Sequence, residues 1–90
     1  MHWPILLRRV IGHSMLPTLS PGKLVIVRPG APLRIGDIVV ATYKGKEVIK
    51  RVVAIDARRV QLIGDNHAHG HSVGWIEKGS IVGRVYYLHM

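Results

Sequence analysis

Residues 38–55 read IVVATYKGKEVIKRVVAI. Two runs rich in valine and isoleucine lie on either side of a short polar segment that contains Gly45. β-Branched residues favour the pleated, half-buried surface of a strand, and a short connection with glycine favours a hairpin. We therefore predict a β-hairpin whose strands are Ile38–Tyr43 and Glu47–Ile55.

Short β-type segments also occupy the rest of the chain. Turn-forming sequences recur between them, as at Pro21-Gly22 and Gly64-Asp65-Asn66. Further strands are predicted at Ile5–Ile11, Leu24–Arg28, Val60–Ile63 and Ile81–Leu88. No segment shows a sustained helical period, and Ser14–Leu19 has room for at most one helical turn. The sequence predicts a mostly β fold, a small coiled antiparallel β-sheet or open barrel, with residues 1–90 as a single domain.

The composition narrows the classes of partner. The 90 residues include thirteen Lys and Arg against five Asp and Glu, a formal net charge of +8. Such a charge attracts an anionic partner, either nucleic acid or an anionic membrane surface. Aromatic residues make up only 6% of the chain and no reading helix is predicted, so we expect no nucleic-acid binding and favour the membrane surface. The absence of cysteine excludes disulfides and thiolate metal sites.

The N-terminal segment has the composition of a membrane contact. Trp3, Ile5, Leu6 and Leu7 are apolar, and two arginines follow them. An apolar patch with a basic margin suits a surface that rests on anionic lipid. In the alternative arrangement, Ile5 and Leu7 form the inner face of the first strand and leave Trp3 and Leu6 exposed. No stretch approaches the ~20 consecutive apolar residues of a spanning helix, so we expect no transmembrane segment.

Ser14 has the surroundings of a nucleophile. It follows the first predicted strand, with Gly12 before it and Pro17 after it. Glycine permits unusual backbone torsion angles and proline interrupts regular structure, so we expect the serine on a rigid, exposed turn. Its own backbone N–H is then a natural donor to an oxyanion. On these residues alone a turn or helix-capping serine is the simpler explanation, with Met15 and Leu19 as core contacts.

Lys50 lies inside an apolar strand. In an extended conformation its face is otherwise apolar, with neighbours Val48, Val52 and Ala54. Glu47, the nearest acid in sequence, points to the opposite side. A lysine buried without an acidic partner has a lowered pKa, which a general base working near neutral pH requires. The alternative is a side chain that runs along the apolar row and reaches water at an edge.

Four short sequences occur in a fixed order along the chain. They are GHSMLPTL at residues 12–19, GDIV at 36–39, IKRV at 49–52 and GDN at 64–66. In these sequences, and over the span from about Val10 to Val85, the chain resembles the type I signal peptidase family of Ser/Lys proteases. The resemblance implies the coiled β-sheet of that family. It also implies that Ser14 is the nucleophile and that Lys50 is the base that takes its proton and returns it to the leaving amine.

The resemblance also implies a substrate. Such enzymes bind a preprotein or leader peptide as an extended strand, beside the segment before the serine and the strand leading to the lysine. His13, Met15 and Ile49 are therefore expected to contact the substrate, which is cut after a small residue such as alanine. Neither preproteins in general nor one dedicated partner is excluded. No metal or organic cofactor is implied. The family acts at the extracytoplasmic face of a membrane, and a soluble cytoplasmic form is the alternative.

Two positions depart from the family pattern. Gly12 stands where some members carry a hydroxyl residue that donates to the oxyanion, so the backbone around Gly12 and Ser14 is expected to supply that donor. The Gly-Asp-Asn sequence is normally followed by a serine-containing segment that buttresses the lysine. Here residues 67–74 read HAHGHSVG, in which Ser72 is the only hydroxyl available to orient Lys50.

Three histidines alternate in this same segment, at His67, His69 and His71. In an extended conformation their imidazoles share one side, a pattern able to bind Zn²⁺ or Ni²⁺. No carboxylate or cysteine completes the set, so we favour a polar loop and expect no metal site.

Two other classes of protein fit parts of the pattern. The first is the related class of self-cleaving repressors and mutagenesis proteins, which use the same dyad to cut their own linker. The residues ahead of Ser14 are expected to be too few to hold such a site and reach back. The second is a non-catalytic basic β module that binds anionic surfaces or nucleic acid.

Overall fold

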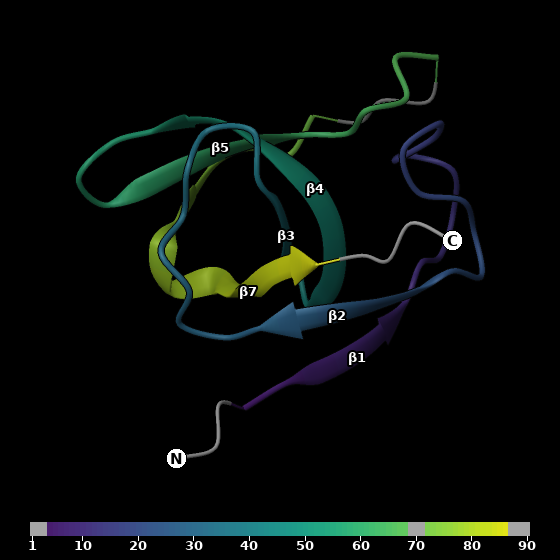
Figure 1. Ribbon diagram of the computed structural model, residues 1–90. Helices are drawn as coiled ribbons and strands as arrows, with labels where there is room; N and C mark the ends of the chain where they lie inside the picture. Colours follow the sequence, from purple (N-terminus) through teal and green to yellow (C-terminus); the bar gives the residue numbers. More distant parts are fainter. Residues whose placement is uncertain (1–3, 69–71, 87–90) are drawn as a thin grey trace.

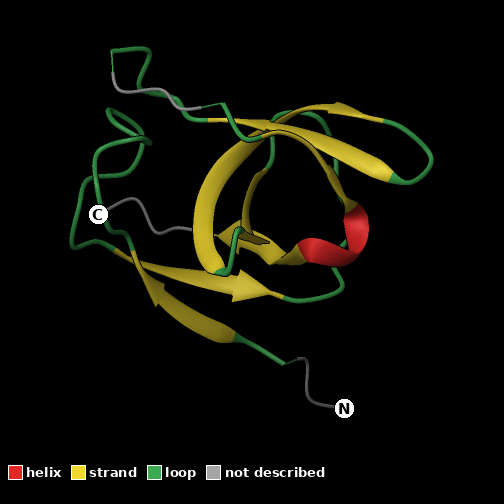
Figure 2. Ribbon diagram, turned by 180° about the vertical axis from the view of Figure 1, so that it is seen from behind, coloured by secondary structure: helices red, strands yellow, loops and turns green. Residues whose placement is uncertain are grey.

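The computed structural model describes residues 4–68 and 72–86. Within these residues, seven strands form one antiparallel sheet that curls into a half-barrel (Figure 1). The strands are β1 (Leu6–Arg9), β2 (Leu24–Arg28), β3 (Ile38–Tyr43), β4 (Lys46–Ile55), β5 (Arg59–Ile63), β6 (Gly74–Glu77) and β7 (Ile81–Tyr86). Their order in the sheet is β1-β2-β7-β3-β4-β5-β6, and a short 3-10 helix, η1 (Lys78–Ser80), leads into β7 (Figure 2). The predicted fold class is confirmed.

The hairpin of β3 and β4 forms where the sequence predicts it. Tyr43 pairs with Lys46 at its tip, and the two residues between them, Lys44 and Gly45, have φ angles of 51° and 77°. Positive φ at both central residues is the geometry of a type I′ turn, which matches the twist of the strands it joins. β4 begins one residue earlier than predicted and runs for ten residues, so it extends past both neighbouring strands of the sheet.

Two strands differ from the prediction, and a third agrees with it as far as the structure describes the chain. β1 covers only Leu6–Arg9 of the predicted Ile5–Ile11, because the chain leaves the sheet toward a turn at Gly12, where φ is +79°. β6 was not predicted, since its four residues start at a glycine and hold no β-branched run. β7 ends at Tyr86, and the remainder of its predicted range lies outside the described residues.

Two apolar clusters lie on opposite faces of β3. Ile38 and Val40 point into the first cluster, whereas Val39 and Ala41 point into the second. Because β3 is central in the sheet, it is buried on both faces, and this explains its nearly continuous apolar sequence. The first cluster contains Val10, Met15, Leu19, Val25, Val27, Ile38, Val40 and Val85. It therefore joins the segment around Ser14 to the sheet.

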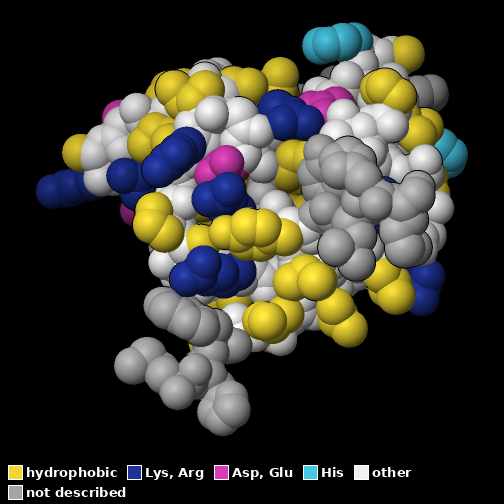
Figure 3. Space-filling view, viewed as in Figure 1, with side chains coloured by type: hydrophobic (Ala, Val, Ile, Leu, Met, Phe, Trp, Pro, Cys, Tyr) yellow, Lys and Arg dark blue, Asp and Glu magenta, His cyan; other side chains and the backbone are white. Residues whose placement is uncertain are grey.

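The outer face of β1 is apolar and exposed. Ile5 and Leu7 have 60% and 61% of their surface exposed, whereas Leu6 packs against the first cluster. The alternative that placed Ile5 and Leu7 on the inner face is therefore wrong, and Trp3 lies outside the described residues. On the face seen in Figure 3, yellow hydrophobic side chains alternate with dark-blue lysines and arginines. No helix within residues 4–68 and 72–86 has the length and apolar character needed to cross a membrane.

Candidate active site

Ser14 lies on a turn that is held by backbone contacts. The Asn66 N–H donates to the Ser14 carbonyl at 2.8 Å, and Asn66 Nδ2 donates to the His13 carbonyl at 2.9 Å. The Leu19 N–H donates to the Met15 carbonyl at 2.9 Å, which closes a single helical turn after the serine. The Met15 side chain is fully buried in the first cluster. The turn is thus held by the packing of Met15 in the first cluster and by the two hydrogen bonds from Asn66.

Lys50 is buried in the middle of β4. Only 6% of its surface is exposed, and it pairs across the sheet with Val39. Within the described residues, its ammonium group takes part in no hydrogen bond or ion pair. Burial without a compensating charge disfavours the charged form, so the pKa of Lys50 is lowered from its ordinary value. Burial therefore favours the neutral amine more than water does.

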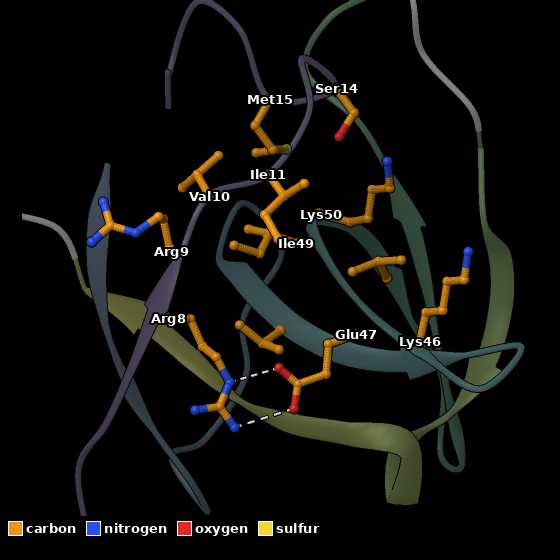
Figure 4. Close-up of a pocket in the computed structure, with 12 residues that line it drawn as sticks. Arg8, Arg9, Val10, Ile11, Ser14, Met15, Lys46, Glu47, Ile49 and Lys50 are labelled. Atoms are coloured by element: carbon orange, nitrogen blue, oxygen red, sulfur yellow. Dashed lines mark hydrogen bonds and ion pairs between the residues drawn. The ribbon is translucent and has the colours of Figure 1, made fainter. Parts of the chain in front are cut away.

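Gly64 brings Ser14 and Lys50 together. A methyl group added at Gly64 would lie 2.7 Å from the Ser14 carbonyl oxygen, 3.3 Å from Ser14 Cβ and 3.5 Å from Lys50 Nζ. One small space above the Gly64 backbone is therefore bounded by both side chains. Figure 4 shows the Ser14 hydroxyl and the Lys50 ammonium on the same side of the cleft, at its upper end. The structure thus brings together the two residues that the sequence predicts to be a nucleophile and its base.

Asp65 links the four short sequences that recur in the family. It accepts hydrogen bonds from Thr18 Oγ1 at 2.5 Å and from Arg51 Nε and Nη2, each at 2.7 Å. Arg51 Nη1 also donates to the Gly36 carbonyl at 2.6 Å. The Arg51 guanidinium, followed by Thr18, lowers the pKa of Asp65. Residues from all four short sequences thus meet around one carboxylate.

A cleft of about 600 Å³ runs from Ser14 and Lys50 along β1 and β4. Met15 and Ile49 line it, as does Ser14, whereas His13 is exposed and does not. The middle of the cleft is apolar, and its far end is closed by a contact between Arg8 and Glu47 (Figure 4). The cleft has the shape to hold an extended peptide between two strands.

The other predicted site residues are placed as follows. Gly12 is exposed on the turn, and the Ser14 N–H donates to no group in the described part of the chain, so it is available to an oxyanion. Ser72 is exposed and makes no hydrogen bond to Lys50. His67 is exposed, whereas His69 and His71 lie outside the described residues. Among the residues that are described, no three potential ligands gather into a metal site.

The sequence did not point to two groups that shape the site. Gly64 lies in a sequence that predicts a turn. In the structure, a side chain at this position would enter the space beside Ser14 and Lys50. Thr18 lies in the first of the four short sequences, and the sequence suggests no role for it. In the structure its hydroxyl donates a hydrogen bond to Asp65. The signal was present in both cases, because each residue lies in one of the four short sequences. The sequence does not show that Thr18 and Asp65 are in contact in the folded chain.

Comparison with known proteins identifies the family of this chain. A family model described as Peptidase S24-like matches residues 4–86. Since the match spans most of the chain, the protein belongs to the S24-like peptidase family, and it is thus a member of a peptidase superfamily. Signal peptidase I of Streptococcus pneumoniae serotype 4 (strain ATCC BAA-334 / TIGR4) is 37% identical to it over 59 residues, as is signal peptidase I of strain ATCC BAA-255 / R6.

The aligned region covers 63% of this chain and 29% of each pneumococcal protein. The chain therefore spans less than a third of the length of these relatives. The resemblance to the type I signal peptidase family that the sequence indicated is confirmed at the level of the family.

Proposed function

We propose that this chain is a serine endopeptidase of the signal-peptidase type, which cleaves signal or leader peptides after small residues. The main support is the meeting of Ser14 and Lys50 above Gly64, at one end of a cleft. The family match and the similarity to signal peptidase I support the same class of activity.

In the proposed mechanism, the neutral Lys50 amine accepts the Ser14 Oγ proton as the oxygen attacks the scissile carbonyl carbon. The resulting oxyanion accepts a hydrogen bond from the Ser14 N–H. The Lys50 ammonium then gives its proton to the leaving amine as the C–N bond breaks, which leaves an acyl-enzyme. Lys50 next takes a proton from water, which attacks the ester, and returns the proton to Ser14 Oγ as the second product leaves.

The substrate is proposed to bind as an additional strand. β1 is an edge strand of the sheet, so one side of its backbone is free to pair with an extended chain. The cleft places this chain between β1 and the first half of β4. Met15 and Ile49 then contact the residues next to the scissile bond. His13 is outside the cleft, so a contact with substrate there requires the peptide to extend beyond Ser14.

An anionic membrane surface is a further proposed partner. Ile5, Leu7 and Leu24 are exposed on the outer face of β1 and β2, and Arg9 pairs across the sheet with Leu24. This face combines apolar side chains with a cation, which suits shallow contact with anionic lipid. It would bring the cleft close to a membrane-bound preprotein and favours the extracytoplasmic, membrane-associated form over a soluble cytoplasmic one.

The dyad is tested with Ser14→Ala, Lys50→Ala and the double variant, with Lys78→Ala as a matched control outside the cleft. Each variant of the dyad is expected to lose cleavage of a preprotein-like peptide by about 10³-fold or more, and the double variant should be hardly worse than either single one. Activity should rise with pH, because the neutral fraction of Lys50 increases as its ammonium group loses a proton. The lowered pKa of Lys50 moves this rise to lower pH. The inflection should fall below the ordinary lysine value of about 10.4.

Substantial activity in either single variant would remove the dyad assignment. An inflection at the ordinary lysine pKa would mean that Lys50 is solvated and that another base is needed. An acylating probe separates an enzyme from a non-catalytic binding module, since it should label the native chain at Ser14 and leave Ser14→Ala unlabelled.

A further inference from the structure

The end of the cleft opposite the dyad carries charged side chains. Arg8 Nε donates to Glu47 Oε1 at 2.6 Å, and Arg8 Nη2 donates to Glu47 Oε2 at 3.2 Å. This two-point contact joins β1 to the start of β4, although the two strands are not neighbours in the sheet. Both side chains keep more than a third of their surface exposed, so a substrate can reach them. Figure 4 shows the contact as two dashed lines below Ile49.

Positive charge exceeds negative charge at this end. Arg8 and Lys46 lie here with Glu47, the single acid among the residues that line the cleft, whereas Arg9 lies beside Val10 and points away from this contact (Figure 4). Arg8 occupies both oxygens of Glu47, and Arg9 Nη1 donates to the neutral Gly22 carbonyl at 2.7 Å. The Lys46 ammonium has no hydrogen bond or ion pair within residues 4–68 and 72–86. Within the described residues, Lys46 is thus the cation at this end that has no acidic partner.

The middle of the cleft contributes no charge. Val10, Ile11, Val40, Val48 and Ile49 line it between the dyad and the charged end. Electrostatic selection of the substrate must therefore act at the charged end, at a fixed distance from the reacting bond. Glu47 and Lys46 precede Lys50 by three and four residues along an extended strand. At roughly 3.3 Å per residue, the charged end lies about 10–13 Å along β4 from the base.

We infer that the cleft selects substrates that carry an aspartate or glutamate three or four residues from the scissile bond, where the carboxylate pairs with Lys46. A peptide strand beside β4 advances at the same rate per residue as β4 itself, so the same count applies to the substrate. This inference rests on the proposed peptidase function, because that function defines the scissile bond. The contribution is comparable to one partly exposed ion pair, a preference of about threefold to fivefold.

The test measures peptide binding to Ser14→Ala by fluorescence anisotropy, so that it does not depend on turnover. The probes are labelled apolar peptides with alanine at the expected cleavage point, and with Asp, Asn or Lys placed in turn at each position on both sides of it. Binding should be about threefold to fivefold tighter for Asp than for Asn at one position three or four residues away, and weaker still for Lys. The preference should decrease at raised salt.

Added substitutions locate the effect. Lys46→Gln should remove most of the preference for Asp, whereas Glu47→Gln should increase it, because it frees Arg8. Arg58→Gln is the matched control, since it also removes one positive charge but lies on an exposed turn outside the cleft. If net charge alone caused the preference for Asp, Arg58→Gln would reduce that preference as much as Lys46→Gln does. That result would overturn the inference.

Equal binding of the Asp, Asn and Lys peptides at every position would also overturn it, as would a lack of binding by all of them. The proposed function fails separately, if the native chain cuts none of the peptides that Ser14→Ala binds. The reverse result, cleavage without any charge preference, leaves the proposed function intact and removes the selection by Lys46.

Discussion

The backbone of Gly64 lies so close to Ser14 and Lys50 that only a hydrogen atom fits at its side-chain position. The φ angle of Gly64 is not in the left-handed region, so other residues can adopt its backbone conformation. The need for glycine is therefore one of space. A Cβ atom 2.7 Å from the Ser14 carbonyl oxygen is closer than real Cβ contacts allow, so the Ser14 turn would have to move.

Gly64→Ala is therefore expected to reduce peptide cleavage by about tenfold to a hundredfold, since a displacement of about 1 Å at a reacting group has an effect of this size. The free energy of unfolding should fall by about 1–3 kcal/mol, as in other overpacked sites. Gly79→Ala is the matched control, because nothing lies within 4 Å of a methyl group there. Cleavage by Gly64→Ala at the native rate would show that the turn has room to relax, and it would contradict this account.

Among the structural elements, the turn that carries Ser14 is linked to β4 through Asp65. The side chain of Asp65 is the point where this turn and β4 are held together, through Thr18 and Arg51. The side chains of Asp65 and Arg51 are only 13% and 30% exposed, so this pair is shielded from water more than the Arg8–Glu47 and Arg59–Asp56 pairs. It contributes accordingly more than an exposed pair.

Asp65→Asn should lower the free energy of unfolding by about 2 kcal/mol at pH 7, in line with the loss of charged hydrogen bonds. The pKa of Asp65 is lowered in the folded chain, so its stabilisation is complete above the unfolded value of about 3.9. It is lost as the pH falls through the lowered pKa. Denaturation curves should thus show a difference between Asp65→Asn and the native chain that shrinks below about pH 4.

Glu77→Gln is the matched control for this measurement, because Glu77 is exposed and its side chain makes no hydrogen bond within the described residues. A difference between Asp65→Asn and the native chain that is constant from pH 7 to pH 2 would mean that the charge of Asp65 contributes nothing.

The local elements of this fold are largely readable from the sequence, and their contacts are not. β2 and β3 have the predicted bounds, because alternation and β-branched residues act over a few neighbours. β6 escaped prediction because its stability comes from pairing with β5, in a register such as Ile76 with Val60, rather than from its own residues.

The site shows the same limit. Ser14 and Lys50 were identified from their local surroundings and from the order of the short sequences, and the structure places them together. The pairing of Arg8 with Glu47 joins residues thirty-nine positions apart in the chain, across a sheet whose curl no local pattern encodes. Sequence placed Glu47 on the face opposite Lys50, but it did not show what that face meets.

Across the whole molecule, the curled sheet separates two surfaces. Its concave side holds the cleft, and the outer side of β1 and β2 exposes Ile5, Leu7 and Leu24 to solvent. A monomer exposes scattered apolar residues as a rule, but three on adjacent strands beside a cation form a surface suited to lipid. The cleft and this surface share β1.

The native chain is expected to co-sediment with vesicles that contain anionic lipid, and to do so less with neutral vesicles or at raised salt. Leu7→Ser should reduce the bound fraction by about threefold or more, because it removes apolar surface from the contact. Ile35→Ser is the matched control, since Ile35 is 67% exposed but lies on the loop before β3. A chain that stays in the supernatant under all conditions would direct the search for substrates toward soluble partners.

The burial of Lys50 also bears on how the protein can change during evolution. A domain of this size buries a smaller share of its surface than a large one, so its margin of stability is narrow. A lysine that is 6% exposed, without an ion pair among the described residues, opposes folding at neutral pH. Selection for thermal stability alone would favour its replacement by methionine or leucine. Persistence of the lysine in evolving lineages would therefore record selection for activity at the expense of robustness.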